Sequence, residues 1–201
     1  MIGLAVAGIG VAFSTRPGLG STPITSLPYV TTFYFSWTLG TATVVFNIFF
    51  ILAQWVILKK RFKFLHAMQL PTLLFFGFFI DLGMWLTAFF VPENYCLQIA
   101  ETALGCLMLA WGICFLLFAN ISYMPADGFI RTVSVEYHIP FGVLKIIFDC
   151  SMVAAAVIFS LIFLGNITGV REGTLVAAFL VGFLIKLSLR PLRRVKKLLL
   201  K

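Results

Sequence analysis

The sequence predicts an all-α polytopic membrane protein, with about six transmembrane helices arranged as two three-helix inverted repeats. The first observation is composition. The chain of 201 residues is 61% hydrophobic and 11% charged, whereas soluble domains carry about 25% charged residues. The second is that six apolar runs approach the roughly 20 residues that a spanning helix needs. The third is that two stretches with proline, glycine and hydroxyl residues, about 100 residues apart, interrupt these runs at equivalent places.

The expected spans follow the apolar runs in chain order within a single membrane domain, residues 1–201. The first run, residues 1–13, is short, so it either lies partly in the membrane interface or has lost residues ahead of it. The other five expected spans are residues 38–58, 71–90, 102–121, 140–164 and 173–189.

Charged residues orient these spans, because cytoplasmic connections carry an excess of Lys and Arg. The connection after the second span carries Lys59, Lys60, Arg61 and Lys63, so we expect it to be cytoplasmic. The connection after the third span, with Glu93 and Glu101, fits the outside. A basic tail at residues 190–201 is expected inside; its bases are Arg190, Arg193, Arg194, Lys196, Lys197 and Lys201. Both termini are therefore predicted to be cytoplasmic.

The net charge of +8 also bears on partners. Because the basic residues lie at the ends of apolar runs, we interpret them as topology signals that also contact anionic lipid. Nucleic-acid binding is not expected. Six spans make a small bundle, so we also consider a homodimer.

A shift of 102 residues aligns the two halves of the chain without gaps. It overlays span on span, within a first repeat at about residues 1–98 and a second at about 103–192. Matched pairs include Gly3 with Gly105, Gly10 with Gly112, Pro23 with Pro125, Gly40 with Gly142 and Thr72 with Thr174, and Asn47 falls on Asp149. Each half holds three spans, an odd number, so the second half must be inverted in the membrane. Many secondary transporters have this organisation.

The first interruption, residues 16–29, reads RPGLGSTPITSLPY. Its prolines and glycines disfavour an uninterrupted helix. In lipid, irregular backbone persists only where protein or a water-filled cavity covers it. We therefore expect this segment and its weaker copy around Pro125 and Asp127 to line one pathway, the first opening outside and the second toward the cytoplasm. The hydroxyl groups of the first segment can hydrogen-bond to a ligand or, more commonly, to backbone groups that have no helical hydrogen-bond partner.

Ionisable residues inside lipid cost about 2.5–3.5 kcal/mol each on insertion scales. Asp149 lies in the fifth span, four residues after Lys145 and so on the same helix face. The pair is either a neutralising ion pair or a proton or ion site facing the pathway. The equivalent position in the first half, Asn47, is also polar.

Asp127 stands between Ala126 and Gly128 in the second interruption, where we favour an Asx-turn or N-cap role over direct substrate contact. Asp81, in the third span, either faces the bundle and is functional or is protonated and hydrogen-bonded to another helix. Arg16 either attracts an anion from outside or anchors the chain at the interface.

These considerations define the expected substrate or ion pathway. Its residues are Gly18, Gly20, Ser21, Thr22, Pro23, Thr25, Asn47, Asp81, Pro125, Asp127, Lys145 and Asp149. Catalytic motifs such as HExxH and GxSxG are absent from the sequence, and the four cysteines lack CxxC spacing. We therefore expect neither an enzyme nor a metal or cofactor site.

At these residues the chain resembles the YczE/YyaS/YitT family of bacterial membrane proteins. The matching segments are GLGSTPITSLPYV at residues 18–30, LGT at 39–41, QLPTLLFFGFFID at 69–81 and PADG at 125–128. The resemblance implies a multi-pass protein of the bacterial inner membrane with a transport-related function. Members often carry Pro-x-Asp in both halves, but here the first copy has Thr25 in place of the carboxylate.

Three functions follow as hypotheses. The leading one is a small secondary transporter or exporter of a small molecule that works by alternating access of the two halves, with protons as the coupling ion that we consider. The main alternative is a substrate-binding membrane subunit of a larger uptake complex, which the 102-residue repeat disfavours. The third, a lipid-modifying enzyme, would need polar catalytic residues at headgroup level, and the acidic pattern around Asp127 is a poor match.

Overall fold

The computed structural model describes residues 1–62, 66, 68–89, 92, 94–119 and 124–199. Lys63, Glu93 and Lys201, three of the charges that orient the predicted spans, lie outside these residues, as do the ends of the third and fourth expected spans. The described residues form helices and contain no strand. The helices are α1 (Ile2–Thr15), α2 (Pro23–Thr32), α3 (Leu39–Leu58), the 3-10 helix η1 (Lys59–Arg61), α5 (Gln69–Leu86), α6 (Tyr95–Ala119), α7 (Pro125–Glu136), α8 (Phe141–Leu164) and α9 (Glu172–Leu199).

Four of the described helical segments are long and apolar enough to cross a membrane. They are Leu39–Arg61, Gln69–Leu86, Tyr95–Leu116 and Phe141–Leu164, which match the second to fifth expected spans. The first expected span corresponds to α1, which is apolar but shorter. The sixth expected span lies within α9, which continues as a helix through most of the basic tail. These segments indicate a helical membrane protein.

The start of the fourth span was predicted wrongly. Helix α6 begins at Tyr95, seven residues before the expected start at Thr102. Glu101, which we placed in an external connection, therefore lies inside α6, where it is only 5% exposed. The single carboxylate in this first part of α6 does not interrupt the helix, because glutamate is a good helix former.

The two interruptions are more helical than the sequence predicts. Residues 16–22 are irregular, but α2 begins at Pro23 and continues through Pro28, and α7 begins at Pro125. A proline at the first helical position loses no helical hydrogen bond, because that N–H has no partner in a helix. The first interruption is thus an irregular segment followed by a short helix, and in both interruptions a proline marks where the short helix starts.

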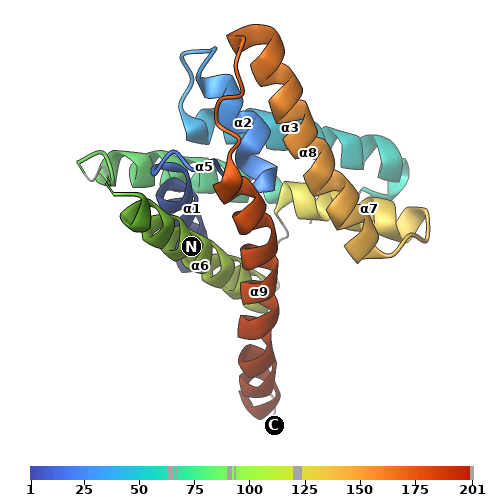
Figure 1. The fold of residues 1–201 in the computed structure, drawn as a ribbon. Helices are drawn as coiled ribbons and strands as arrows, with labels where there is room; N and C mark the ends of the chain where they lie inside the picture. Colours follow the sequence, from blue (N-terminus) through green and yellow to red (C-terminus); the bar gives the residue numbers. More distant parts are fainter. Residues whose placement is uncertain (63–65, 67, 90–91, 93, 120–123, 200–201) are drawn as a thin grey trace.

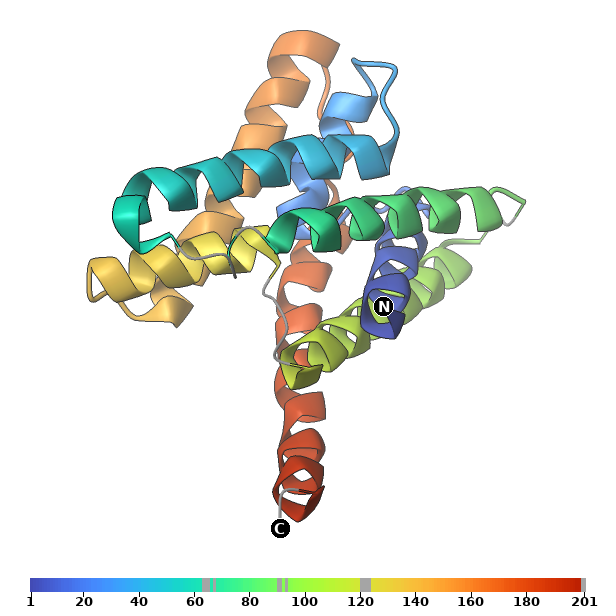
Figure 2. The same ribbon diagram turned by 180° about the vertical axis from the view of Figure 1, so that it is seen from behind.

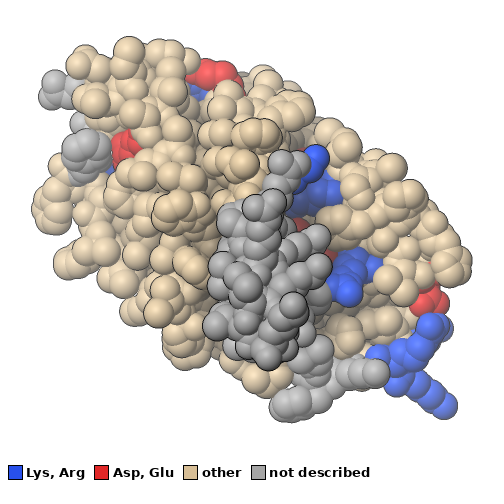
Figure 3. Space-filling view, turned by 90° about the horizontal axis from the view of Figure 1, so that it is seen from below, with Lys and Arg blue, Asp and Glu red and all other residues tan. Residues whose placement is uncertain are grey.

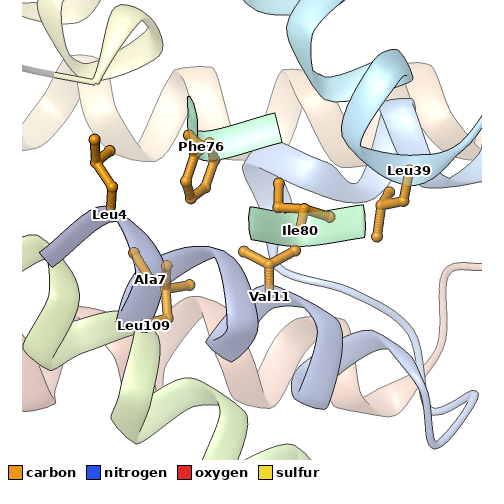
Figure 4. Packing of buried hydrophobic residues seen from close by; sticks show 7 residues of the cluster. All are labelled: Leu4, Ala7, Val11, Leu39, Phe76, Ile80 and Leu109. Atoms are coloured by element: carbon orange, nitrogen blue, oxygen red, sulfur yellow. The ribbon is translucent and has the colours of Figure 1, made fainter. Parts of the chain in front are cut away.

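The main hydrophobic core lies where α1 packs between α5 and α6. Its residues, shown in Figure 4, are Leu4, Ala7 and Val11 from α1, Leu39 from α3, Phe76 and Ile80 from α5, and Leu109 from α6. Glycines allow α1 and α6 to approach closely: a Cβ atom on Gly10 would lie 2.5 Å from the backbone nitrogen of Leu109 and 2.9 Å from the carbonyl oxygen of Gly105. This interface joins the two halves of the chain.

The remaining helices continue from this core on both sides. Helix α5 also packs on α3, and α6 also packs on α9. The two short helices, α2 and α7, each pack against both α3 and α8. In Figures 1 and 2, the connection after α8 descends from the upper end of that helix to the start of α9, and the lower part of α9 extends beyond the other helices.

The outer faces of the long helices carry large apolar side chains. Phe49 and Trp55 of α3, Phe78 of α5, Ile162 of α8 and Phe179 of α9 are all more than half exposed. Seen from below, most of the described surface is formed by uncharged residues, with Lys and Arg gathered in a few patches (Figure 3). An apolar surface of this extent is suited to contact with lipid rather than with water.

Candidate functional site

Three charged side chains from α7 and α8 meet in one cluster, the Asp127–Lys145–Asp149 triad. The ammonium nitrogen of Lys145 lies 2.9 Å from Oδ1 of Asp149 and 3.4 Å from Oδ1 of Asp127. The expected i, i+4 pair is therefore present, and a second carboxylate joins it from α7. All three side chains are partly buried, at 21–29% exposure. Lys145 thus bridges the short helix α7 to the long helix α8.

The capping role that we favoured for Asp127 is wrong. Met124 occupies the N-cap position of α7, and no side chain caps this helix end by a hydrogen bond. Asp127 instead lies in the first turn, where a negative charge is stabilised by the helix dipole. Its carboxylate is directed to Lys145, so the residue connects two helices rather than closing a turn.

The triad belongs to an inner face of α8 that runs along the helix. Met152, Ala156 and Ser160 are its buried residues, and Asp149 precedes Met152 by three positions, which places it on the same side. Three phenylalanine rings pack together beside the first half of α8. They are Phe50 from α3, Phe129 from α7 and Phe148 from α8, with ring centroids 5.1–6.1 Å apart. Through these rings, α3, α7 and α8 pack against one another.

Helix α3 presents a matching inner face that is polar but uncharged. Thr43, Asn47 and Gln54 are buried on it. The Asn47 side chain donates to the carbonyl oxygen of Thr43 at 2.9 Å. The hydroxyl of Thr43 has no hydrogen-bond partner among the described residues.

A pair of buried glutamines connects α3 to α5 and to the start of α7. Gln54 donates to Oε1 of Gln69 at 3.1 Å and to the carbonyl oxygen of Pro125 at 3.1 Å, and Gln69 donates back to Gln54 at 3.3 Å. Both side chains are at most 4% exposed. The predicted pathway residue Pro125 is therefore held at the first turn of α7 by a side chain from the other half of the chain.

The first interruption packs against the start of α9. The N–H of Ser21 donates to the hydroxyl of Thr174 at 3.2 Å, and the N–H of Gly173 donates to the carbonyl oxygen of Leu19 at 2.9 Å. Gly20 has a φ of +110°, and a Cβ atom there would collide with the Thr174 side chain. A glycine is therefore required at this position for both conformation and close approach.

The hydroxyls of the first interruption serve its own backbone. Thr22 and Thr25 share a hydrogen bond of 2.7 Å between their hydroxyl oxygens, and Thr25 also reaches the carbonyl oxygen of Thr22 at 3.1 Å. The Ser26 hydroxyl donates to the carbonyl oxygen of Pro23 at 2.6 Å. All of these side chains are buried. Gly18, with a φ of +74°, completes the turn that precedes α2.

Asp81 lies apart from the triad and contacts the start of α3. Its Oδ1 accepts from the N–H of Gly40 at 2.7 Å, and its Oδ2 accepts from the Thr38 hydroxyl at 2.7 Å. The residue is hydrogen-bonded to another helix, as one of the two interpretations expects. Arg16 is likewise engaged, donating to the carbonyl oxygen of Ala88 at 2.8 Å.

The structure thus places ten of the twelve predicted pathway residues in three groups, and the other two, Asn47 and Pro125, lie on the inner face of α3 and at the first turn of α7. Asp127, Lys145 and Asp149 come together, the residues from Gly18 to Thr25 form the first interruption, and Asp81 caps α3. Sequence reasoning missed Gln54 and Gln69, although a glutamine inside an apolar run such as Gln54 is itself a signal. It also missed Thr174, whose partners lie more than 150 positions earlier in the chain.

No curated protein and no solved structure matches the chain. The model of one protein family, described as a family of unknown function (DUF6198), matches residues 1–190, which is nearly the whole chain. The chain therefore belongs to the family of unknown function DUF6198.

Proposed function

We propose that this protein is a small secondary transporter that moves a small molecule across the bacterial inner membrane, with both termini in the cytoplasm. The observation that carries the proposal is the Asp127–Lys145–Asp149 triad, a partly buried group of charges between the short helix α7 and the apolar helix α8. Ionisable residues within apolar helices mark ion and substrate pathways. We also infer that DUF6198 is related to the YczE/YyaS/YitT family.

Support for an inverted repeat comes from the contact between α1 and α6. The 102-residue shift makes Gly3 equivalent to Gly105, and Gly10 equivalent to Gly112. In space the pairs are crossed: Gly3 faces Gly112, and Gly10 faces Gly105. A two-fold axis produces this crossed pattern. If position i of one half contacts position j of the other half, the symmetry requires position j of the first half to contact position i of the second. The two halves would therefore be related by a two-fold axis through this interface.

The neighbours of the other helices support the same relation. The shift makes α5 equivalent to α9, so the packing of α1 on α5 corresponds to that of α6 on α9. It makes α2 equivalent to α7 and α3 equivalent to α8, so the packing of α2 on α8 corresponds to that of α7 on α3. Each short helix is thus enclosed by a long helix of its own half and one of the other half.

One pair of equivalents differs, and this difference supports alternating access. Helix α3 packs on α5, where Gly40 contacts Gly77 and Asp81. The corresponding helices α8 and α9 make no comparable contact in the described part of the chain, and a Cβ atom on Gly142, the equivalent of Gly40, would have no neighbour within 4 Å. If α8 packed on α9 and α3 separated from α5, the second half would adopt the present arrangement of the first half, and the first half that of the second.

Charge counting supports coupling to a proton. Two carboxylates share one ammonium group in the triad, so the triad carries one excess negative charge when all three residues are ionised. The same shift relates Asp127, Lys145 and Asp149 to Thr25, Thr43 and Asn47, which are neutral. The first half therefore offers no second copy of the ionic site. A single proton would neutralise the triad. It would thereby lower the free energy of placing the triad in lipid, which is about 2.5–3.5 kcal/mol per charge on insertion scales.

Transport into proteoliposomes tests this proposal. A panel of small-molecule substrates is screened with and without a pH gradient, using the wild-type protein, the Asp149→Asn variant and, as a matched control, the Glu136→Gln variant, which changes an exposed ion pair outside the triad. We expect uptake that responds to the gradient in the wild type and the control, and at least a tenfold loss of that response in Asp149→Asn. Equal coupled uptake by all three proteins would exclude Asp149 from the mechanism, and failure of every candidate to move would remove the support for transport.

A further inference from the structure

Glu101 is a buried carboxyl group that the triad does not involve. Its side chain is 5% exposed, and neither carboxyl oxygen has a hydrogen-bond partner among the described residues. It lies in the second turn of α6. A buried charged group is normally paired or hydrogen-bonded, because an ionised carboxylate without donors is costly in an apolar environment.

The position of Glu101 relative to α1 follows from helix geometry. Gly105, one turn further along α6, contacts the backbone of Phe13 and Ser14 at the end of α1. Residues four apart lie on the same helix face, and α1 and α6 run in opposite directions, since Gly10 faces Gly105 and Gly3 faces Gly112. Glu101 is therefore directed toward the point where α1 ends and the first interruption begins.

The described charged groups around this point are engaged elsewhere. Arg16, in the first interruption, is the cation whose field reaches Glu101, but it makes no ion pair with Glu101 among the described residues, and its guanidinium donates to Ala88. Helix α1 has no titratable side chain within Ile2–Thr15. At the start of α9, Glu172 accepts from Arg171 at 3.0 Å and from the Tyr95 hydroxyl at 3.4 Å. From α5, Asp81 accepts from α3, and α2 contributes Tyr29, which also lies in the field of Arg16.

We propose that Glu101 is a reversible proton-binding site at the first interruption, separate from the triad. In the arrangement described here, the carboxyl group binds one proton and is neutral, because none of the described residues donates a hydrogen bond to the anion. A movement that admits water at the end of α1 would release that proton, and Arg16 would then stabilise the carboxylate. The assignment does not require the triad to couple transport, so each can fail without the other.

Infrared difference spectroscopy of the protein in lipid nanodiscs tests the assignment. The carbonyl stretch of a protonated carboxyl group is followed as the pH is raised, in the wild type, in Glu101→Gln and in the matched control Glu172→Gln, which alters an exposed carboxylate at the start of α9. Glutamine preserves the size of the side chain without its acidity. We expect a band that disappears with rising pH in the wild type and in Glu172→Gln, and the loss of that band in Glu101→Gln.

Thermal unfolding of the same samples gives a second measurement. If Glu101 is neutral when buried, raising the pH should lower the unfolding temperature of the wild type more than that of Glu101→Gln. Identical spectra for the wild type and Glu101→Gln would overturn the proposal. It would also be overturned if sodium ions, at fixed pH, stabilise the wild type and not Glu101→Gln, because the carboxylate would then bind a metal cation instead of a proton.

Discussion

At the scale of single residues, Asp81 illustrates how a charge inside an apolar helix can have a structural role. Its carboxylate accepts two hydrogen bonds at the first turn of α3, from the Gly40 N–H and the Thr38 hydroxyl. A helix N-terminus has unsatisfied N–H groups and a partial positive charge, so a carboxylate there stabilises it in two ways. The residue therefore links the ends of α3 and α5.

We predict that Asp81→Ala lowers the free energy of unfolding by about 1–3 kcal/mol, because the Gly40 N–H and the Thr38 hydroxyl lose their acceptor. Asp81→Asn keeps one acceptor oxygen and should cost less. Thermal unfolding in detergent measures both effects. An Asp81→Asn variant with wild-type stability that fails to transport in proteoliposomes would instead place Asp81 in the transport mechanism.

The triad shows how far residue-level prediction extends. The pairing of Lys145 with Asp149 follows from the i, i+4 spacing alone. Asp127 is 18 positions before Lys145 in the chain, and only the packing of α7 on α8 brings it within 3.4 Å. The partner of Asp81 could not be predicted for the same reason, since Gly40 is 41 positions away. Local spacing predicts contacts within a helix but not between helices.

At the scale of elements, apolar runs predicted where the long helices lie but not where they begin and end. Helices α3 and α8 match their expected spans within one residue at each end. Helix α6 starts earlier, because its first turns include polar residues that hydropathy excludes from a span. The short helices α2 and α7 were expected as irregular segments, because proline content alone does not distinguish a helix start from a break.

Helix α6 also provides a test of the interface between the halves. A Cβ atom on Gly105 would lie 2.7 Å from the carbonyl oxygen of Gly10 and 2.8 Å from the carbonyl carbon of Phe13. Since backbone atoms cannot rotate away, we predict that Gly105→Ala lowers the free energy of unfolding by about 1–3 kcal/mol.

The matched control is Gly182→Ala in α9, where a Cβ atom would meet nothing within 4 Å. There, the helix preference of alanine should raise the free energy of unfolding by about 0.5–1 kcal/mol. Chemical denaturation of both variants in mixed micelles measures the difference. If the two substitutions have the same effect, the close approach of α1 and α6 is not a property of the folded protein.

At the scale of the whole molecule, the long helices pack in a row that the two short helices connect to α8. From the α1–α6 interface, one side leads through α5 to α3, and the other leads to α9, with α2 and α7 held between α3 and α8. The 102-residue shift proposes equivalent residues from the sequence, but it could not predict which of them are in contact. The crossed glycine pairs depend on the antiparallel contact of α1 and α6, which only the packed helices reveal.

The proposed inverted repeat predicts that the two short helices enter the membrane from opposite sides. The predicted pathway residues Ser21 and Pro125 cannot test this, because they are buried and inaccessible to a labelling reagent. Exposed positions next to the same helices can replace them. Phe35 lies in the turn between α2 and α3, and His138 lies between α7 and α8. Lys60 provides an internal reference, because Arg61 and Glu136 form an ion pair of 2.7 Å that places the ends of α3 and α7 side by side.

We predict that a membrane-impermeant maleimide labels the Phe35→Cys variant in intact cells, and labels His138→Cys and Lys60→Cys only after permeabilisation. The background lacks the exposed Cys96 and Cys150 and keeps the buried Cys106 and Cys114. Opposite sides follow because α2 would enter from outside and α7 from the cytoplasm, as inversion of one half requires. Labelling of Phe35→Cys and His138→Cys from a common side would mean that both short helices enter the membrane from that side. The two halves would then have the same orientation, and alternating access between two inverted halves would be excluded.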